Sequence, residues 1–312
     1  DILDIRRLLE DRNSDIHIIA KIENKEGVDN LDEIIQVADG LMVARGDLGV
    51  EIPTEEVPLV QKQMIDRCNM VGKPVITATH AIYDGTDAVM LSGETAAGKY
   101  PVEAVRTMSR IARRTEEAAY YQNNLAGKRI AFKPSVTDAI SHATYEIAAD
   151  LGASAIITSS EYGTTAKMVA KYRPSAPIIA TTRIERVAAK LCLVWGVYSV
   201  VVQHSDGTDQ MINESIEACL NAGYIRRGDL VVITAGVPVG VPGTTNMIKV
   251  HVVADVLAHG TGIGNRAVVG RVCLALSPEE ARIRMRPGDI LVTRATDRDF
   301  TPVIEKSAAL VV

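Results

Sequence analysis

The sequence predicts an α/β protein built on parallel sheets, and two observations carry that prediction. Aromatic residues make up only 4% of the 312 residues, whereas 47% are hydrophobic. The core must therefore consist mainly of aliphatic side chains, as in strands that are buried on both faces. Short apolar runs also recur along the chain, and helix-like segments separate many of them, which is typical of parallel α/β folds.

Four apolar runs between residues 15 and 95 end in polar residues: IHIIAKIEN, DGLMVARGD, KPVITAT and TDAVMLSGET. The loops after parallel strands gather on one face of a β/α barrel, and barrel enzymes place their active sites there. An amphipathic helix that stops at Gly72 separates the second run from the third. We therefore interpret residues 1–125 as the C-terminal half of a TIM (β/α)8 barrel.

The connection between the third and fourth runs is too short for a parallel crossover. GTDAVML follows Thr79 almost directly, whereas such a crossover needs roughly a dozen residues. Either these strands are not parallel neighbours or residues are missing, and we favour a discontinuity between His80 and Ala81. A long helix, KYPVEAVRTMSRIARRTEEAAYY, then closes this part. Its helical spacing predicts an inward face made of Val102, Val105, Met108 and either Ile111 or Ala112.

Residues 126–255 predict a compact, doubly wound α/β domain. It begins with a helix capped by Ser135, and the strand-like runs ASAIITSS, PIIATTR, VYSVVV and GDLVVITAG then alternate with helices. The glycine-rich GTGIGNRAVVG follows a helix-like segment rather than a strand, so we interpret it as a linker instead of a dinucleotide site. The strand-like runs after it indicate that residues 256–312 are a linker and the first part of a third domain.

Composition argues against several classes of protein. The net charge of −5 is modest, and no basic run is interleaved with aromatics, which disfavours nucleic acid as a partner. No apolar stretch approaches the ~20 residues of a membrane span. The charged N-terminal segment DILDIRRLLEDRN does not resemble a signal peptide. It also lacks an initiating Met, so we do not expect it to be the natural start. Four scattered cysteines without metal spacing, Cys68, Cys192, Cys219 and Cys273, predict buried free thiols in a reducing cytoplasm.

Two strand ends carry groups suited to metal and phosphate chemistry. In KIEN, Lys21 and Glu23 lie on one side of a strand, although an isolated K-x-E is more often a structural ion pair. In ARGDLGVEIP, Asp47 ends the next strand, while Gly46 and Gly49 let the backbone approach a ligand. Two carboxylates from adjacent strands form a hard oxygen site for Mg²⁺ or Mn²⁺.

The next two strand ends carry Thr79 in VITATH, and Ser92 and Glu94 in LSGET. Taken together and in this order, KIENKEGV, DGLMVARGDLGVEIP, GKPVITAT and DGTDAVMLSGETAAGKYPVEAV closely resemble pyruvate kinase. That family transfers the phosphoryl group of phosphoenolpyruvate to ADP in glycolysis, giving pyruvate and ATP. Phosphoryl transfer depends mainly on positioning and charge neutralisation, which a metal and a lysine both supply.

The resemblance implies a role for each of these residues. Glu23 and Asp47 would ligate the metal, and Lys21 would stabilise the transferring phosphoryl group. The full substrate-binding set would be Lys21, Ala44, Arg45, Gly46, Asp47 and Thr79, with the Gly46 and Asp47 N–H groups on the substrate carboxylate. Thr79 would take part in proton delivery to the enolate carbon, with Ser92 and Glu94 as relay residues.

The resemblance also implies Mg²⁺ or Mn²⁺, K⁺, and a cytoplasmic homotetramer. The family's early barrel strands, cap domain and monovalent-cation ligands would precede Asp1. A helix-forming segment would lie between His80 and Ala81. Because the 312 residues contain none of these, we do not expect this chain alone to close a barrel or to be active.

The run TSSEYGTTAKMVAKYRP passes from a strand into a helix through hydroxyl residues and a glycine, as phosphate-binding helix N-termini do. The candidate ligands are Thr158, Ser159, Ser160, Gly163, Thr164 and Thr165. A capped surface turn is the alternative. By resemblance this is the pyruvate kinase C-terminal domain, whose loop binds phosphorylated effectors such as a sugar phosphate or AMP. ITAGVPVGVPGTTNMIKV would close over the effector, and Glu161 would repel a phosphate beside it.

Residues 256–312 resemble the start of the swivelling phosphohistidine-type domain appended to pyruvate kinases of bacilli. No histidine follows His259, so we expect no phosphoryl carrier here. Two other functions stay open. One is a Mg²⁺-dependent carbon–carbon lyase of the pyruvate-enolate barrel superfamily, which ADP dependence would separate from a kinase. The other is a non-catalytic fragment that only binds an effector.

Overall fold

The structure is a computed structural model, and it describes residues 1–117, 135–203, 207–237, 244–254 and 268–312, with the backbone alone at 78–81. The chain divides into two compact units, residues 1–255 and 256–312. Its described strands form one four-stranded, one five-stranded and one three-stranded sheet. No helix among these residues is both long enough and apolar enough to cross a membrane.

The first part of the chain builds an open parallel sheet, as predicted. Its elements are α1 (Ile2–Asp11), β1 (Ile19–Ile22), α2 (Lys25–Asp29), α3 (Leu31–Val37), β2 (Gly40–Val43), α4 (Arg45–Glu51), α5 (Val57–Val71), β3 (Val75–Ala78), η1 (Thr79–Asp84), β4 (Ala88–Met90), α6 (Gly93–Ala96) and α7 (Pro101–Glu116). The sheet order is β1-β2-β3-β4, and every neighbouring pair is parallel. The carboxyl ends of these strands therefore share one edge.

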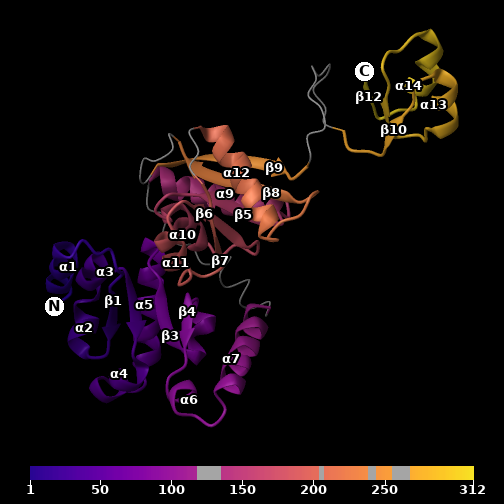
Figure 1. Ribbon diagram of the computed structural model, residues 1–312. Coiled ribbons are helices and arrows are strands. Elements are labelled where there is room, and N and C mark those ends of the chain that lie inside the picture. The colour runs from indigo at the N-terminus through magenta and orange to yellow at the C-terminus, as the bar shows by residue number, and fades with distance from the viewer. Residues whose placement is uncertain (118–134, 204–206, 238–243, 255–267) are drawn as a thin grey trace. The chain divides into compact units, whose positions relative to one another are not determined.

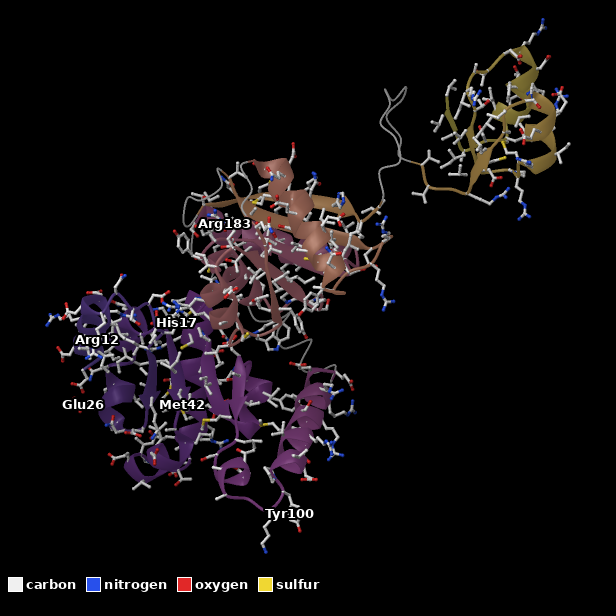
Figure 2. The ribbon with its side chains drawn as sticks, viewed as in Figure 1. Arg12, His17, Glu26, Met42, Tyr100 and Arg183 are labelled. Carbon is white, nitrogen blue, oxygen red and sulfur yellow. The ribbon has the colours of Figure 1, made fainter. Side chains whose placement is uncertain are left out.

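Helices cover one face of this sheet. Leu41 and Val43 of β2 are buried with Met64 and Ile65 of α5, and α5 ends at Gly72, whose φ of 67° gives the left-handed cap. Figure 1 shows α3 and α5 beside the strands. Side chains alternate along a strand, so Met42 (Figure 2), opposite Lys21 in the pairing of β1 with β2, points to the other face.

The predicted inward face of α7 is wrong for this chain. Val102, Val105 and Ile111 are exposed, and Met108 and Ala112 are only half-buried. Tyr100 at the start of the helix is also exposed and extends outward in Figure 2. Amphipathic spacing identifies which side chains share a face, but that face is buried only where a partner element covers it.

The short connection between β3 and β4 does join parallel neighbours. Ile76, Thr77 and Ala78 pair in parallel with Ala88, Val89 and Met90, and only η1 and a few residues lie between the two strands. The alternative that these strands are not neighbours is therefore wrong. The predicted discontinuity between His80 and Ala81 stays a prediction.

The second part is doubly wound. Its elements are α9 (Val136–Asp150), β5 (Ala155–Ser159), α10 (Thr164–Ala170), β6 (Ile178–Thr182), α11 (Glu185–Leu191), β7 (Val197–Val201), α12 (Thr208–Asn221), β8 (Leu230–Gly236) and β9 (Thr245–Val252). Ile156 packs with α9, α10 and α11 on one face of the sheet, whereas Ile157 packs with α12 on the other. Figure 1 shows this layered arrangement. Ser135 caps α9 as predicted, accepting the N–H of Asp138 at 3.1 Å.

The strand β9 was not predicted from the sequence. The sheet order is β7-β6-β5-β8-β9, and β9 is its one antiparallel member among the described strands. Its residues belong to the segment ITAGVPVGVPGTTNMIKV, which the sequence predicts to be a loop because a glycine- and proline-rich run leads directly into them. As an edge strand in the described sheet, β9 pairs with β8, and half-buried and exposed residues fill most of it.

Residues 268–312 form a separate three-stranded parallel sheet in the order β10-β11-β12. The elements are β10 (Val272–Leu274), α13 (Pro278–Arg284), β11 (Ile290–Val292), η2 (Arg298–Phe300), α14 (Thr301–Ile304) and β12 (Ala309–Val311). Its small core contains Ala281, Leu291, Phe300 and Val303. The interpretation of GTGIGNRAVVG as a linker falls mostly outside the described residues.

All four cysteines are free thiols, but not all are buried. Cys68, Cys219 and Cys273 are buried as predicted, whereas Cys192 is exposed. Cys192 lies directly after α11, where the helix that covers the sheet has already ended. The prediction of four buried thiols was therefore wrong at this position.

Candidate functional site

Lys21, Glu23 and Asp47 come together at the carboxyl edge of the first sheet. The ammonium of Lys21 pairs with the Glu23 carboxylate and lies 3.0 Å from Oδ2 of Asp47. Hydrogen bonds with Glu23 first, and then with Asp47, raise the pKa of Lys21 above its ordinary value. All three side chains are about half exposed, so the cluster is accessible to a ligand.

Asp47 reaches this cluster from a helix rather than from a strand end. β2 stops at Val43, and Asp47 lies in the first turn of α4, where the helix dipole favours a carboxylate. The buried Ala44, which precedes the helix, donates its N–H to the carbonyl of Ile22 at 3.0 Å. This bond ties the end of β2 to β1 and brings the two carboxylates close together.

The start of α4 also presents backbone N–H groups that no side chain caps in the described ranges. Arg45, Gly46 and Asp47 are the first helical residues, and no side chain caps them, so their N–H groups have no partner within the helix. A Cβ placed on Gly46 or Gly49 would meet nothing within 4 Å. The glycines therefore leave open space beside this turn, and both lie inside the helix.

The donor set at this edge fits a hard divalent cation. Glu23 and Asp47 supply two carboxylates, while no group of three or more His, Cys, Asp or Glu residues in the described parts of the chain could hold a metal. Mg²⁺ is often held by one or two carboxylates, with water and substrate oxygens filling the remaining positions. Lys21 contacts both carboxylates and would compete with a cation for them.

Two other predicted residues form a local turn of their own. Ser92 precedes α6 and donates its N–H to Oε2 of Glu94 at 3.0 Å. Backbone hydrogen bonds, first from Glu94 itself and then from Ser92, lower the pKa of the Glu94 carboxyl. A carboxyl that is held ionised is a poor proton donor. Thr79 begins η1 directly after β3, and its side chain lies outside the described residues.

The predicted effector residues surround the carboxyl end of β5. Thr158 and Ser159 end this strand, and Gly163 precedes α10 with a φ of 74°. Thr158 is buried, and its hydroxyl has no partner in the described part of the chain. Thr164 begins the helix and is exposed.

Thr165 differs from the other predicted effector residues. It is buried, and its hydroxyl is 2.7 Å from the hydroxyl of Thr245 on β9. This contact holds α10 against the edge strand of the sheet. The side chain therefore faces the interior, where it supports the loop instead of lining its surface.

A cation that the sequence analysis missed lies beside this loop. Arg183 follows β6, and its guanidinium lies 2.8 Å from the carboxylate of Glu161, so the charge expected to repel a phosphate is paired. Figure 2 labels Arg183 in the α/β part of the chain. The sequence did contain a signal for this cation, because Arg183 is the basic residue that ends the strand-like run PIIATTR.

The second predicted loop lies mostly outside the described residues, but its base is visible. Asn246 accepts the N–H of Val237 at 2.9 Å and donates to its carbonyl at 2.7 Å. β5 and β8 are neighbours in the centre of the sheet although helices and two strands separate them in sequence. Open α/β sheets bind ligands where the strand order reverses in this way.

Comparison with known proteins identifies both parts. The model of the pyruvate kinase barrel domain matches residues 1–82 and again 79–105, and that of the pyruvate kinase alpha/beta domain matches residues 138–251. This chain belongs to the pyruvate kinase family. Pyruvate kinase of Geobacillus stearothermophilus is 53% identical over 333 aligned positions, that of Bacillus licheniformis 51%, and that of Staphylococcus aureus MRSA252 44% over 332.

The chain covers only part of these pyruvate kinases. Each alignment includes 100% of the chain and 57% of the relative, so residues 256–312 also have counterparts in the relatives. The alignments are longer than the 312 residues of the chain, so these pyruvate kinases carry residues that it lacks.

Proposed function

We propose that the full-length protein is a pyruvate kinase, which transfers the phosphoryl group of phosphoenolpyruvate to ADP and yields pyruvate and ATP. The observation that carries this proposal is the cluster of Lys21, Glu23 and Asp47, which one sheet edge assembles from two adjacent parallel strands and the helix after the second. Family membership supports the reaction.

Different residues of the cluster would bind the metal, the phosphoryl group and the substrate carboxylate. Glu23 and Asp47 would hold Mg²⁺ or Mn²⁺, which when bound supplies positive charge beside the phosphoryl oxygens. Lys21 would exchange its contacts with the two carboxylates for the phosphoryl group and neutralise charge during transfer. The N–H groups of Gly46 and Asp47 at the start of α4 would orient the substrate carboxylate, beside Ala44 and Arg45.

Proton delivery to the enolate carbon would come from the side of β3 and β4. Thr79 follows β3 and Ser92 follows β4, at the same sheet edge as Lys21. Glu94 would orient Ser92 through its backbone N–H instead of giving up a proton, because its pKa is lowered. K⁺ is included in this proposal by family membership alone.

The test is ADP-dependent formation of pyruvate by the full-length protein. A kinase forms pyruvate from phosphoenolpyruvate only when ADP and a divalent cation are present, and ATP appears in equal amount. A carbon–carbon lyase would instead release pyruvate from a hydroxy-keto acid without ADP. If Lys21→Met and Glu23→Gln retained the full rate, the non-catalytic alternative would replace the catalytic assignments.

We also propose an effector site at the carboxyl ends of β5 and β8, for a sugar phosphate or AMP. Three observations support it: the switch in strand order, the buried hydroxyl of Thr158, which meets no partner among the described residues, and the pairing of Glu161 with Arg183. Ser159, Ser160 and Thr164 would contact the phosphate, with Gly163 shaping the turn. Thr165 would act by holding α10 to Thr245.

The remaining proposals concern the whole protein. The barrel model matches in two pieces that meet at residues 79–82, which supports missing residues between His80 and Ala81. We propose three domains with the predicted boundaries, 1–125, 126–255 and 256–312, the last being the start of a swivelling domain. Family membership supports a cytoplasmic homotetramer.

A further inference from the structure

Arg173 joins the α/β part of the chain to the amino ends of the barrel strands β3 and β4, opposite the carboxyl edge that carries Lys21. It follows α10, and its side chain is only 2% exposed. The guanidinium donates to Oδ1 of Asp87 at 2.8 Å, to the carbonyl of Gly85 at 2.7 Å and to Oδ1 of Asn69 at 3.1 Å. Three acceptors from the barrel half therefore fix one side chain of the neighbouring domain.

The surroundings of Arg173 hold it in a constrained geometry. Its φ of 51° is left-handed, which is uncommon without glycine and strains the backbone. Its guanidinium lies over the ring of Trp195, 5.1 Å from the centroid, and the backbone N–H of Trp195 donates to the same Asp87 oxygen at 3.3 Å. Strained residues persist where the surrounding contacts over-determine them. We call Arg173, Asp87 and Trp195 the Arg173 clamp.

The clamp continues directly into two strands. The second oxygen of Asp87 accepts the N–H of Val75 at 3.1 Å, and the Asp87 N–H donates to the carbonyl of Val75 at 3.1 Å. The hydroxyl of Thr86 donates to the same carbonyl at 2.8 Å. Val75 begins β3, and β4 begins directly after Asp87. Asp87 therefore couples Arg173 to the amino ends of both strands.

We propose that Arg173 is a positioning residue for the barrel site: it fixes the amino ends of β3 and β4 and thereby sets where Thr79 and Ser92 lie. This inference rests on the proposed function. Lys21 and Glu23 belong to the β1 side of the sheet and Asp47 to α4, and the hydrogen bonds of the clamp reach none of them. The clamp governs proton delivery more than the binding of substrate or metal.

The decisive variant is Arg173→Lys in the full-length protein, since lysine keeps the charge and loses the planar fork. We expect kcat to fall by at least about fivefold, because small displacements of reacting groups are costly. KM for phosphoenolpyruvate and the affinity for Mn²⁺ should stay within about twofold. Arg67→Lys, which alters an exposed pair with Asp32, is the control and should change neither constant.

Two further measurements test the clamp independently of catalysis. The ring of Trp195 lies against the guanidinium, so in the full-length protein Arg173→Lys should shift tryptophan emission, whereas Arg67→Lys should not. Hydrogen exchange should accelerate at residues 75–90 in Arg173→Lys and also in Asp87→Asn, which serves as the second variant if the first folds poorly. A wild type without kinase activity would overturn the proposed function and leave these two tests valid.

The inference is wrong if either of two results is found. One is unchanged exchange at residues 75–90 together with unchanged Trp195 emission in both variants. The other is a parallel loss of kcat, substrate affinity and Mn²⁺ affinity, which a merely structural role of Arg173 would produce.

Discussion

The ammonium of Lys21 lies 3.0 Å from Asp47, although the two residues belong to different strand–helix units of the sheet. The same nitrogen contacts Glu23, so one lysine neutralises both carboxylates that are proposed to hold the metal. Lysine and metal therefore compete for the same oxygens. Metal binding and release of Lys21 towards a phosphoryl group should be coupled.

This competition predicts that Lys21→Met binds Mn²⁺ more tightly than wild type while losing activity. We expect a gain of about fivefold at low ionic strength, since removing one nearby positive charge favours another cation at the site. Asp47→Asn should weaken binding by about tenfold or more, because it removes one of two charged ligands. Electron paramagnetic resonance of free Mn²⁺ measures both changes.

Lys25→Met is the matched control, since Lys25 forms an exposed pair with Asp29 and both residues lie in α2. Its Mn²⁺ affinity should equal that of wild type. Weaker Mn²⁺ binding by Lys21→Met would show that the lysine supports the metal site instead of competing for it.

The pairing of Glu161 with Arg183 predicts a charge-dependent effector site. Arg183→Met should weaken AMP binding by about tenfold, because Glu161 is then left unpaired beside the phosphate. Adding Glu161→Gln should restore most of the lost affinity, and Arg186→Met on the next helix should leave it unchanged. Isothermal titration calorimetry measures all four proteins, and an unaffected Arg183→Met would remove Arg183 from the site.

Gly163 is expected to tolerate alanine less well than another left-handed glycine. Its φ is 74°, and an added Cβ would lie 3.0 Å from Cδ2 of Leu191. Gly152 has a φ of 59° with nothing within 4 Å of its Cβ. Gly152→Ala should therefore cost roughly 1–2 kcal/mol of unfolding free energy, and Gly163→Ala measurably more. Urea unfolding checks the difference, and equal costs would show that Leu191 relaxes freely.

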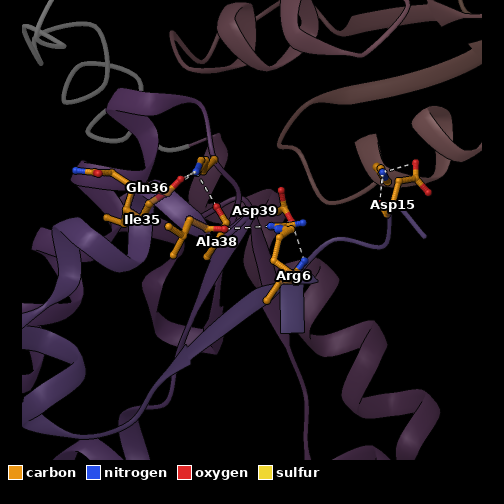
Figure 3. Close-up of polar contacts among 10 residues, drawn as sticks. Arg6, Asp15, Ile35, Gln36, Ala38 and Asp39 are labelled. Atoms are coloured by element: carbon orange, nitrogen blue, oxygen red, sulfur yellow. Dashed lines mark hydrogen bonds and ion pairs between the residues drawn. The ribbon is translucent and has the colours of Figure 1, made fainter. Parts of the chain in front are cut away.

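His17 predicts a loss of stability in mild acid. Burial first, then the positive charges of Lys167, Lys190 and Arg6, lowers its pKa in the folded protein, while Asp39 opposes them. Asp39 is itself paired with Arg6, as Figure 3 shows. The unfolded chain then binds more protons than the folded one below about pH 6.5, so stability falls as pH falls through that value.

The measurement is the unfolding free energy of wild type and His17→Gln between pH 7.5 and 5.5. The variant should lose less stability on acidification than wild type. It should keep some loss, because the pKa of His251 is also lowered by burial. Parallel curves for the two proteins would show that His17 makes no contribution.

The local pattern predicted most of the fold and indicated which side chains meet at the carboxyl edge of the first sheet. Strand periodicity was enough to place Lys21 and Glu23 on one side, and the order of the strands brought Asp47 beside them. The sequence pattern could not show where β2 ends. ARGD follows the apolar run directly, and no residue between them marks the start of α4. The exposed α7 was missed for a different reason, since burial depends on a partner that the pattern does not contain.

The long-range contacts were the part that no local pattern contained. Arg173 meets Asp87 across 86 positions of the chain, and Thr165 meets Thr245 across 80. Lys190 and Arg186 likewise pair with Asp15, a pairing that lowers the pKa of Asp15 to about 2. Each of these residues is polar and unremarkable in its own segment, and only the fold shows which partner it meets.

The most direct test of the central claim is phosphorus-31 NMR of the full-length protein with phosphoenolpyruvate, ADP and Mg²⁺. The wild type should convert phosphoenolpyruvate to ATP in equal amounts. The double variant Glu23→Gln and Asp47→Asn should do so at least about 100-fold more slowly, while its circular dichroism stays unchanged. Consumption of phosphoenolpyruvate without ATP, or a double variant with the wild-type rate, would contradict the assignment of Lys21, Glu23 and Asp47 as the phosphoryl-transfer site.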